Sequence, residues 1–365
     1  MRLDDYDDDN GAGLPIIYTV LGVSAFILVV LGIVVAVNGN KKPKNTVVSN
    51  YTVTEAVAEA VPTNEERKIV AGDLDIWDMY PEEPPVKKDT VATDVVKPTV
   101  AVSPSPTAEP DYNDGKHVEI VYEDGSTEWV KINDKIEKNN YDYTNLVDSG
   151  GKLKYVTDGR KISFLGIDVS RYQKEIDFSQ IKDQGIDFVM IRVGARGYKT
   201  GNITMDECFE QNLNNAIEAG MDVGVYFYSQ AINVAEAEEE ANMVINALGE
   251  RKITYPIAFD MEYVSNDTAR IDTLTKDEKT LITSAFVNKI KEAGFRPMIY
   301  GNKEWLLKRI DVSKFDQSSI WLAQEDEKPD YPYMFDMWQY TTEGSLYGIE
   351  GSVDMNICFV DYHAQ

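Results

Sequence analysis

Apolar and polar positions follow two different spacings in the C-terminal part of the chain. From residue 164 onward, short continuous apolar runs alternate with longer segments in which apolar residues recur every three or four positions. The short runs are typical of buried β-strands and the longer segments of amphipathic helices. This pattern predicts strands at 164–169, 188–194, 222–228, 256–261, 296–300, 320–323, 337–340 and 353–359. It predicts helices at 178–184, 205–219, 234–248, 276–293 and 303–310.

Glycines separate the predicted helices from the strands after them. Gly185, Gly220 and Gly294 each stand after a helix and before a strand, where a C-cap glycine is expected. Eight strands that alternate with helices in about 200 residues predict an α/β fold, a flattened and irregular (β/α) barrel of the TIM type. The last connections are too short for full helices, so we expect the closing strands to be irregular or antiparallel.

The segment before the barrel has the alternation of a β-hairpin. Residues 117–132 alternate on both sides of Asp124-Gly125, the residues that a tight turn requires. With residues 140–162, this hairpin forms a small β subdomain or packs directly on the barrel. We therefore assign residues 114–160 to a small β-hairpin subdomain and residues 161–365 to the barrel.

The first 113 residues divide by composition into three parts. Residues 1–13 are a short acidic tail, and residues 14–37 contain no charged side chain, so they are long enough to cross a bilayer as a helix. A cleaved signal peptide would have a shorter apolar region after a basic segment, so we favour an uncleaved transmembrane anchor. Residues 38–113 are rich in Pro, Thr and acidic residues, which predicts a disordered linker.

The composition argues against several classes of function. The chain has 62 acidic and 36 basic residues and a formal net charge of -26, so it has no basic surplus to bind a nucleic acid backbone. Cys208 and Cys358 are far apart among apolar neighbours and are expected to be buried free thiols, not a disulfide or a zinc site. Neither His117 nor His363 is placed for a Ser-His or Cys-His nucleophile system. We expect no metal and no cofactor, and any enzyme built from this chain would work with carboxylates.

Carboxylates gather at the predicted ends of the barrel strands. The apolar run 257–259 leads to Asp260 and Glu262, which lie two positions apart and therefore project to the same face of a strand. Asp168 lies near the end of the first strand and Asp354 in the eighth. A barrel brings these strand ends around one mouth, where active sites lie. Singly, each acid could cap a turn or face solvent, but their coincidence at one rim favours function.

Further side chains on these strands are expected to bind substrate at the mouth. They are Tyr226, Tyr228, Arg192, Tyr300, Trp321, Trp338, Gln339 and Asn356. Each aromatic residue alone would more often belong to the core, and we interpret Arg192 as an ion-pair partner that keeps a crowded carboxylate ionised. Because crowded carboxylates cannot all stay ionised, at least one should be protonated near neutral pH. A protonated carboxyl beside an ionised one can cleave a glycosidic bond, and the spacing of Asp260 and Glu262 leaves retention and inversion both open.

The order of these motifs resembles glycoside hydrolase family 25 lysozymes, the Chalaropsis-type N,O-diacetylmuramidases. The resemblance covers the chain from residue 164 to the C-terminus. The matching segments are Gly166-Ile-Asp-Val-Ser-Arg-Tyr-Gln173, Phe188-Val-Met-Ile-Arg-Val-Gly194, Gly224-Val-Tyr-Phe-Tyr228, Asp260-Met-Glu262, Trp338-Gln-Tyr340 and Val353-Asp-Met-Asn356. No single segment is specific, but their combination is.

The resemblance implies an enzyme that cleaves the β-1,4 bond between N-acetylmuramic acid and N-acetylglucosamine in peptidoglycan. It implies that Glu262 is the proton donor and that Asp260 assists the substrate's own 2-acetamido group in a retaining reaction. Asp168 and Asp354 match the remaining acids of the family's catalytic ring. Residues 1–160 lie outside the resemblance.

Two alternatives remain open beside a membrane-anchored muramidase. The first is a catalytically silent, membrane-anchored relative that binds glycan as a scaffold. The second concerns topology, because Lys41, Lys42 and Lys44 come after the predicted span and by the positive-inside rule favour a cytoplasmic domain. Peptidoglycan lies outside the membrane, so we expect a single-pass cell-membrane protein whose catalytic domain faces the cell wall.

Overall fold

The computed structural model describes residues 112, 114–122, 125–265, 267–315 and 318–364. The predicted acidic tail, the predicted membrane span at 14–37 and nearly all of the predicted linker lie outside these ranges. Among the described residues, no helix is long and apolar enough to cross a membrane.

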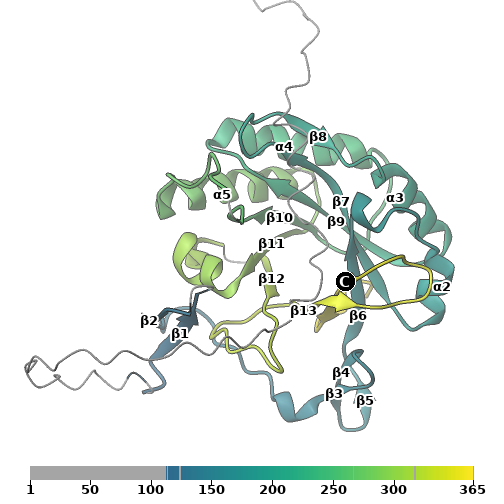
Figure 1. Cartoon of the computed structure of the whole chain (residues 1–365), viewed down its shortest axis with the longest axis horizontal. Coiled ribbons are helices and arrows are strands. Elements are labelled where there is room, and N and C mark those ends of the chain that lie inside the picture. The colour runs from purple at the N-terminus through teal and green to yellow at the C-terminus, as the bar shows by residue number, and fades with distance from the viewer. Residues whose placement is uncertain (1–111, 113, 123–124, 266, 316–317, 365) are drawn as a thin grey trace, which may run out of the picture. The chain divides into compact units, whose positions relative to one another are not determined.

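A closed ring of eight strands forms the centre of the fold (Figure 1). Around the ring, the strands follow the order β6, β14, β13, β12, β11, β10, β9 and β7, and pairing of β6 with β7 closes it. A short ninth strand, β8 (Ile203–Met205), extends the sheet from β7. The ring strands are β6 (Phe164–Val169), β7 (Phe188–Arg196), β9 (Asp222–Ser229), β10 (Ile257–Met261), β11 (Pro297–Asn302), β12 (Ser319–Ala323), β13 (Met337–Gly344) and β14 (Val353–Cys358).

The ring departs from an all-parallel barrel at one strand, as the short final connections predict. β14 runs antiparallel to both of its neighbours, β13 and β6, whereas the other ring pairs are parallel. Only residues 345–352 join β13 to β14, and a parallel crossover needs a dozen or more residues. The predicted antiparallel closure is confirmed.

Helices cover only part of the ring, and two of them differ from the prediction. The helices are α2 (Phe178–Asp183), α3 (Phe209–Glu218), α4 (Val234–Leu248) and α5 (Lys276–Glu292). α3 begins later than predicted because residues 203–205 pair with β7 as β8. The predicted helix at 303–310 is a π-helical segment, η5 (Trp305–Arg309). Gly185, Gly220 and Gly294 have φ of +86°, +69° and +85°, the left-handed backbone expected of C-cap glycines.

Short 3-10 turns and two small sheets complete the described chain. The 3-10 turns are η3 (Tyr143–Asn145), η4 (Arg171–Gln173) and η6 (Val312–Lys314). One small sheet pairs β1 (His117–Val121) with β2 (Thr127–Lys131), as the Asp124-Gly125 turn predicts. The other joins β3 (Leu146–Asp148), β4 (Leu153–Thr157) and β5 (Arg160–Lys161).

These small sheets pack against the barrel. Tyr141 stacks on Phe359 at 4.2 Å between ring centroids, and its hydroxyl donates to the backbone oxygen of Phe335 at 2.8 Å. Val118 and Tyr155 are buried in the same hydrophobic cluster as the outer barrel face. The N-terminal β region therefore belongs to the barrel's core and takes the place of helices beside the last strands.

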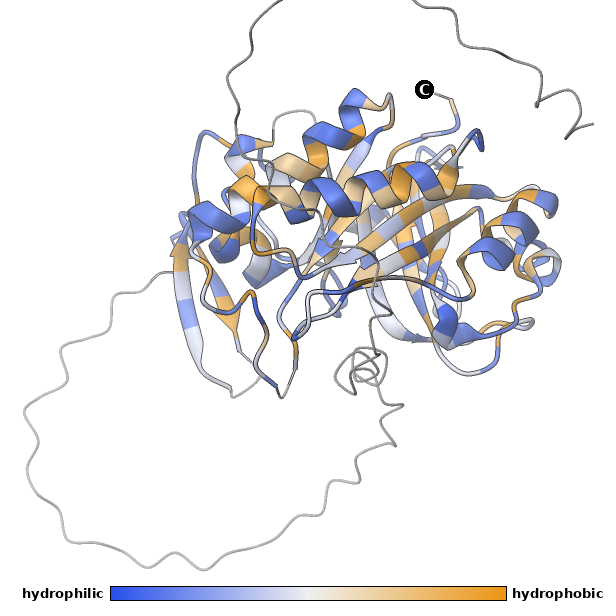
Figure 2. Cartoon of the chain, turned by 90° about the horizontal axis from the view of Figure 1, so that it is seen from above, coloured by the Kyte–Doolittle hydropathy of each residue, from blue (hydrophilic) through white to orange (hydrophobic). Residues whose placement is uncertain are grey.

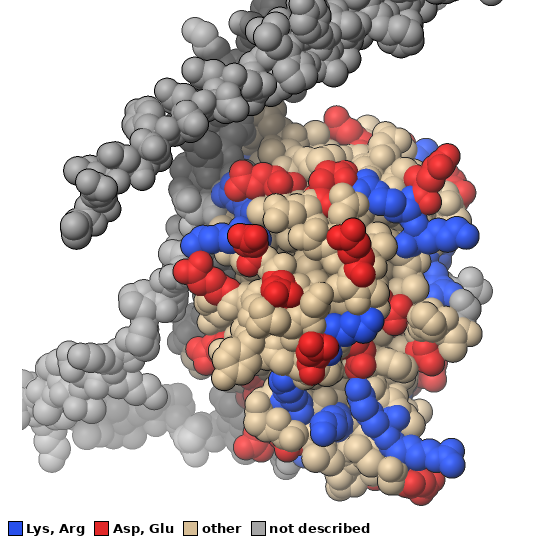
Figure 3. All heavy atoms as spheres, turned by 90° about the vertical axis from the view of Figure 1, so that its right-hand side faces the viewer, with Lys and Arg blue, Asp and Glu red and all other residues tan. Residues whose placement is uncertain are grey.

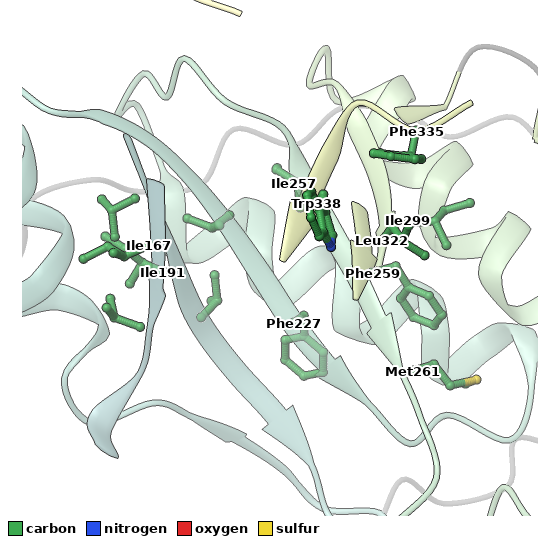
Figure 4. Close-up of a cluster of buried hydrophobic side chains, with 14 of the residues drawn as sticks. Ile167, Ile191, Phe227, Ile257, Phe259, Met261, Ile299, Leu322, Phe335 and Trp338 are labelled. Carbon is green, nitrogen blue, oxygen red and sulfur yellow. The ribbon is translucent and has the colours of Figure 1, made fainter. Parts of the chain in front are cut away.

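Side chains alternate between the two faces of the ring. Outward residues such as Phe227 and Phe259 form one cluster with the helices (Figure 4). Inward residues such as Met190, Trp321 and Met337 form a second cluster inside the ring. In Figure 2, hydrophobic residues run along the strands and alternate with hydrophilic ones along the helices. This alternation decides which predicted residues reach the interior of the ring.

Charged side chains of both signs share the surface. Figure 3 shows Lys and Arg interspersed with Asp and Glu on one face of the molecule. Several make exposed ion pairs, such as Lys161 with Asp187 at 2.7 Å. Exposed pairs contribute little stability, so packing in the apolar clusters holds the fold.

Candidate active site

Asp168 is a buried carboxylate held by two oriented amides. It projects inward near the end of β6, and its Oδ2 accepts from Gln339 Nε2 at 3.0 Å and from Asn356 Nδ2 at 2.7 Å. The oxygens of the two amides are already occupied, because Tyr300 OH donates to Gln339 Oε1 at 2.9 Å and Trp321 Nε1 donates to Asn356 Oδ1 at 2.7 Å. Neither amide can flip without losing a bond, so both must donate to Asp168.

Asp354 shares a proton with Asp168. The two residues are direct partners across the β14–β6 ladder, and their side chains are hydrogen-bonded. Burial and the neighbouring Asp168 raise the pKa of Asp354 to about 10. Burial also raises the pKa of Asp168, but hydrogen bonds from Asn356, Gln339 and Asp354 oppose that rise. Asp354 therefore holds the proton and donates it to the Asp168 carboxylate.

Asp260 lies on the opposite side of the ring with an open acceptor. It pairs in register with Tyr228 on one neighbouring strand and Tyr300 on the other. Its side chain is 5 % exposed, and its Oδ1 has no hydrogen-bond partner among the described residues. Burial, followed by the charges of Glu262 and Asp168, raises its pKa well above the usual range. Asp260 therefore binds its proton tightly.

Glu262 stands just beyond the end of β10 and is half-buried. The charge of Glu262 contributes to the raised pKa values of Asp260 and Asp354. The structure thus brings all four predicted acids to the same end of the ring. β6 and β10 run parallel and end there, whereas the antiparallel β14 begins there with Asp354 as its second residue.

Aromatic rings line the interior beneath these acids. Trp321 meets Tyr300 edge-on at 4.9 Å and Tyr226 edge-on at 6.0 Å. Trp321 is 1 % exposed, so it forms the floor and acts on the site through Asn356. Tyr226 and Tyr300 are half-buried above it. Burial raises the pKa of Tyr228 well above its usual range, with Glu262 and Asp260 adding to the rise.

Arg192 is an ion-pair partner, as predicted, but its carboxylate is one that the prediction did not include. Its Nε donates to Asp206 Oδ2 at 2.9 Å, and both side chains are buried. Asp206 also accepts from the backbone N–H groups of Arg171 and Cys208, at 3.1 and 3.0 Å. The Arg192 charge still opposes the rise in the pKa of Asp168. Nothing in the sequence marked Asp206, which precedes a helix like an ordinary capping residue.

The structure contradicts two predictions from the sequence, one about Trp338 and one about Cys208. Trp338 is fully buried on the outer face of β13, where it packs in the cluster that includes Leu322 (Figure 4), and its Nε1 donates to the backbone oxygen of Gln324 at 2.8 Å. Its neighbour Gln339 takes the inward position, so Trp338 cannot reach a sugar at the mouth. Cys208 is half-buried rather than buried, whereas Cys358 is buried as expected.

Two surface hollows lie away from the acids. One, of about 630 Å³, is lined by residues of β8, α3 and α4, and the other, of about 770 Å³, lies beside the start of α2. None of the four acids lines either hollow. We place the candidate site at the end of the ring because titratable groups, fixed donors and aromatic rings converge there. Within the described ranges, no group of three or more His, Cys, Asp or Glu side chains is arranged to hold a metal ion.

Comparison with known proteins identifies relatives of the barrel. The family "Glycosyl hydrolases family 25" matches residues 167–349, half of the chain. The uncharacterized protein YegX of Escherichia coli O157:H7 is 26% identical over 197 residues, which are 53% of this chain and 68% of YegX. The autolytic lysozyme of Clostridium acetobutylicum is 23% identical over 192 residues, 52% of this chain and 54% of the lysozyme. A solved family 25 glycosyl hydrolase from Bacillus anthracis has 24% identity and a TM-score of 0.47, covering 59% of this chain and 96% of that one.

Proposed function

We propose, from the premise that the chain belongs to glycosyl hydrolases family 25, that it is a peptidoglycan muramidase. Membership of this family makes it a glycosidase of the lysozyme type. The proposed reaction is hydrolysis of the β-1,4 bond between N-acetylmuramic acid and N-acetylglucosamine. The chain spans only about half the length of the autolytic lysozyme that it resembles, and cleavage of peptidoglycan is what we propose for it.

Glu262 is the proposed general acid. It is half-buried at the end of β10, beside an acid that holds its proton tightly. A general acid must protonate the leaving oxygen and then recover a proton from solvent, which requires some exposure. Glu262 meets this requirement better than the buried Asp168 and Asp260.

Asp260 is the proposed partner of the substrate's 2-acetamido group. Its buried Oδ1 without a partner among the described residues is an acceptor that the acetamido N–H of a bound sugar would satisfy. Burial raises the pKa of Asp260 well above the usual range, and a protonated carboxyl still keeps an acceptor oxygen for that N–H while the acetamido oxygen attacks the anomeric carbon. Attack from within the substrate followed by water gives overall retention. This open, buried acceptor beside a half-exposed acid is the observation that carries the proposal.

The test is to identify the new chain ends. Purified peptidoglycan is treated with the full-length protein, reduced with borohydride and hydrolysed, and the sugar alcohols are identified by mass spectrometry. New muramic acid-derived alcohol is expected. Glucosamine-derived alcohol would assign the cut to the other bond, and no new ends would favour the catalytically silent scaffold. The control is Glu262→Gln, which should lose most activity at unchanged melting temperature because it lies outside the buried core.

We propose from the sequence that residues 14–37 anchor the protein in the cell membrane with the barrel on the cell-wall side. A reporter cysteine within residues 38–113 should react with a membrane-impermeant maleimide on intact cells. Cys208→Ser removes the one half-buried native thiol from the background. Labelling that requires cell lysis would instead support the cytoplasmic orientation indicated by Lys41, Lys42 and Lys44.

A further inference from the structure

Gln230 contacts the backbone of Glu262 from inside the protein. It directly follows β9 and its side chain is fully buried. Its Nε2 donates to the backbone oxygen of Glu262 at 2.9 Å and lies 3.5 Å from Tyr228 OH. A backbone carbonyl oxygen can only accept, so the amide nitrogen, not the oxygen, must face Glu262.

This bond begins where the strand ladder stops. The register of β9 and β10 ends at the pair Ser229 and Met261, one residue before Glu262. Beyond that pair, the side chain of Gln230 supplies the contact to the next residue of the neighbouring strand. Glu262 is thereby tied to the rigid ring although it stands outside it.

Packing alone does not account for an amide at this position. Gln230 Oε1 is buried and has no hydrogen-bond partner among the described residues. A buried acceptor without a partner destabilises a fold, and an apolar side chain of similar size carries no such cost. Because the amide lowers stability at this position, we infer that its hydrogen bond to the backbone of Glu262 has a function.

The turn that carries Gln230 is itself fixed from both sides. Ser229 Oγ donates to Glu240 Oε2 at 2.6 Å and accepts from the backbone N–H of Ala231 at 3.2 Å. Glu240 is in turn bonded to Arg196 Nε at 2.7 Å. The donor of Gln230 is therefore held on a rigid support, which positioning of another residue requires.

We propose that Gln230 is a positioning residue for the general acid, fixing the Glu262 backbone and so the direction of its carboxyl group. The inference rests on the proposed function, in which Glu262 protonates the leaving oxygen. Misplacing a catalytic group by about 1 Å can cost on the order of a hundredfold in rate. Loss of the Gln230 bond should therefore lower kcat while leaving substrate binding intact.

The experiment uses the full-length protein and a soluble tetrasaccharide of alternating N-acetylglucosamine and N-acetylmuramic acid. Gln230→Met keeps the size of the side chain and removes the donor, and we expect kcat to fall by about tenfold to a hundredfold with KM within about twofold. Gln230→Asn keeps an amide but is too short to reach Glu262, so it should show the same loss of kcat. It takes the place of the methionine variant if that variant folds poorly. Asn212→Leu is the matched control, because Asn212 is a buried amide on α3 away from the acids, and its kcat should not change.

A double mutant separates positioning from general disruption. In a Glu262→Gln background, the proposed acid is already absent, so adding Gln230→Met should lower the residual rate no further. Equal loss in both backgrounds would overturn the inference, as would normal kcat in Gln230→Met and Gln230→Asn. Full activity of Glu262→Gln alone would instead overturn the proposed function, so the two failures are distinguishable.

Discussion

The paired carboxyls of Asp168 and Asp354 predict an asymmetric response to the same substitution. Each can be changed to asparagine, which keeps the shape and removes the charge. Asp354 acts as a neutral donor to Asp168, and the amide of Asp354→Asn can make the same donation. Asp168 acts as a charged acceptor for two oriented amides, and an asparagine there has only one weaker, neutral oxygen to offer.

The difference in folding free energy comes from the hydrogen bonds. A hydrogen bond to a charged group contributes about 1.5–3 kcal/mol, against about 0.5–1.5 kcal/mol between neutral groups. Asp168→Asn turns three hydrogen bonds to a charged group, from Gln339, Asn356 and Asp354, into bonds between neutral groups, so we expect a loss of about 3–4 kcal/mol. Asp354→Asn exchanges one neutral donor for another, and the loss should stay below about 1 kcal/mol.

Urea denaturation at pH 7 measures both losses. Asp183→Asn on the exposed side of α2 provides the baseline for this substitution, expected within about 0.5 kcal/mol of the wild type. Should Asp354→Asn destabilise the protein as much as Asp168→Asn, or more, the proton would not reside on Asp354 and the assignment of donor and acceptor would be wrong.

Three further predictions concern the rest of the molecule. Tyr141→Ala removes the stacking on Phe359 and should lower the stability of the barrel by about 2–4 kcal/mol. Calorimetry measures the loss, with Val147→Ala at an exposed position as the control. Separate melting of the N-terminal β region would contradict its packing into the barrel core. Burial raises the pKa of Glu240 from 4.5 to about 7, so the wild type should lose about 3 kcal/mol as pH rises through that window. Urea denaturation at pH 4.5 and at about pH 7 should show no such loss in Glu240→Gln. Activity should survive EDTA, because carboxylate acid–base chemistry requires no metal.

The fold could be predicted where local pattern and tertiary structure agree. Strand 164–169 and helix 234–248 match β6 and α4 to the residue, because an apolar run and an amphipathic repeat with an Asn233 cap define them locally. β8 could not be predicted, since three residues acquire strand structure only by pairing with β7. The π-helical geometry of η5 likewise could not be predicted, because its five residues make a single turn that is too short to show a period.

The residues of the site that the sequence reveals most clearly are the acids at the ends of predicted strands. The four acids stand out because charged residues interrupt apolar runs at equivalent positions. Trp338 was misplaced because the run Met337-Trp-Gln-Tyr340 shows no apolar–polar alternation to reveal which face each residue takes. Asp206 and Gln230 were missed because each acts through a partner far away in sequence, and a single sequence does not pair them.

The hydrogen bonds assign a distinct task to each acid at the end of the ring. Asp168 accepts hydrogen bonds from Asn356, Gln339 and Asp354, all of which favour its charged form, so it is a poor proton donor. The proton of Asp354 is committed to Asp168. Asp260 is buried with its pKa raised well above the usual range, so it binds its proton tightly and is a poor general acid. Glu262 is left as the half-exposed acid able to exchange its proton with water at each turnover, and we infer that the other three hold charge and protons in fixed positions around it while the sugar bond breaks.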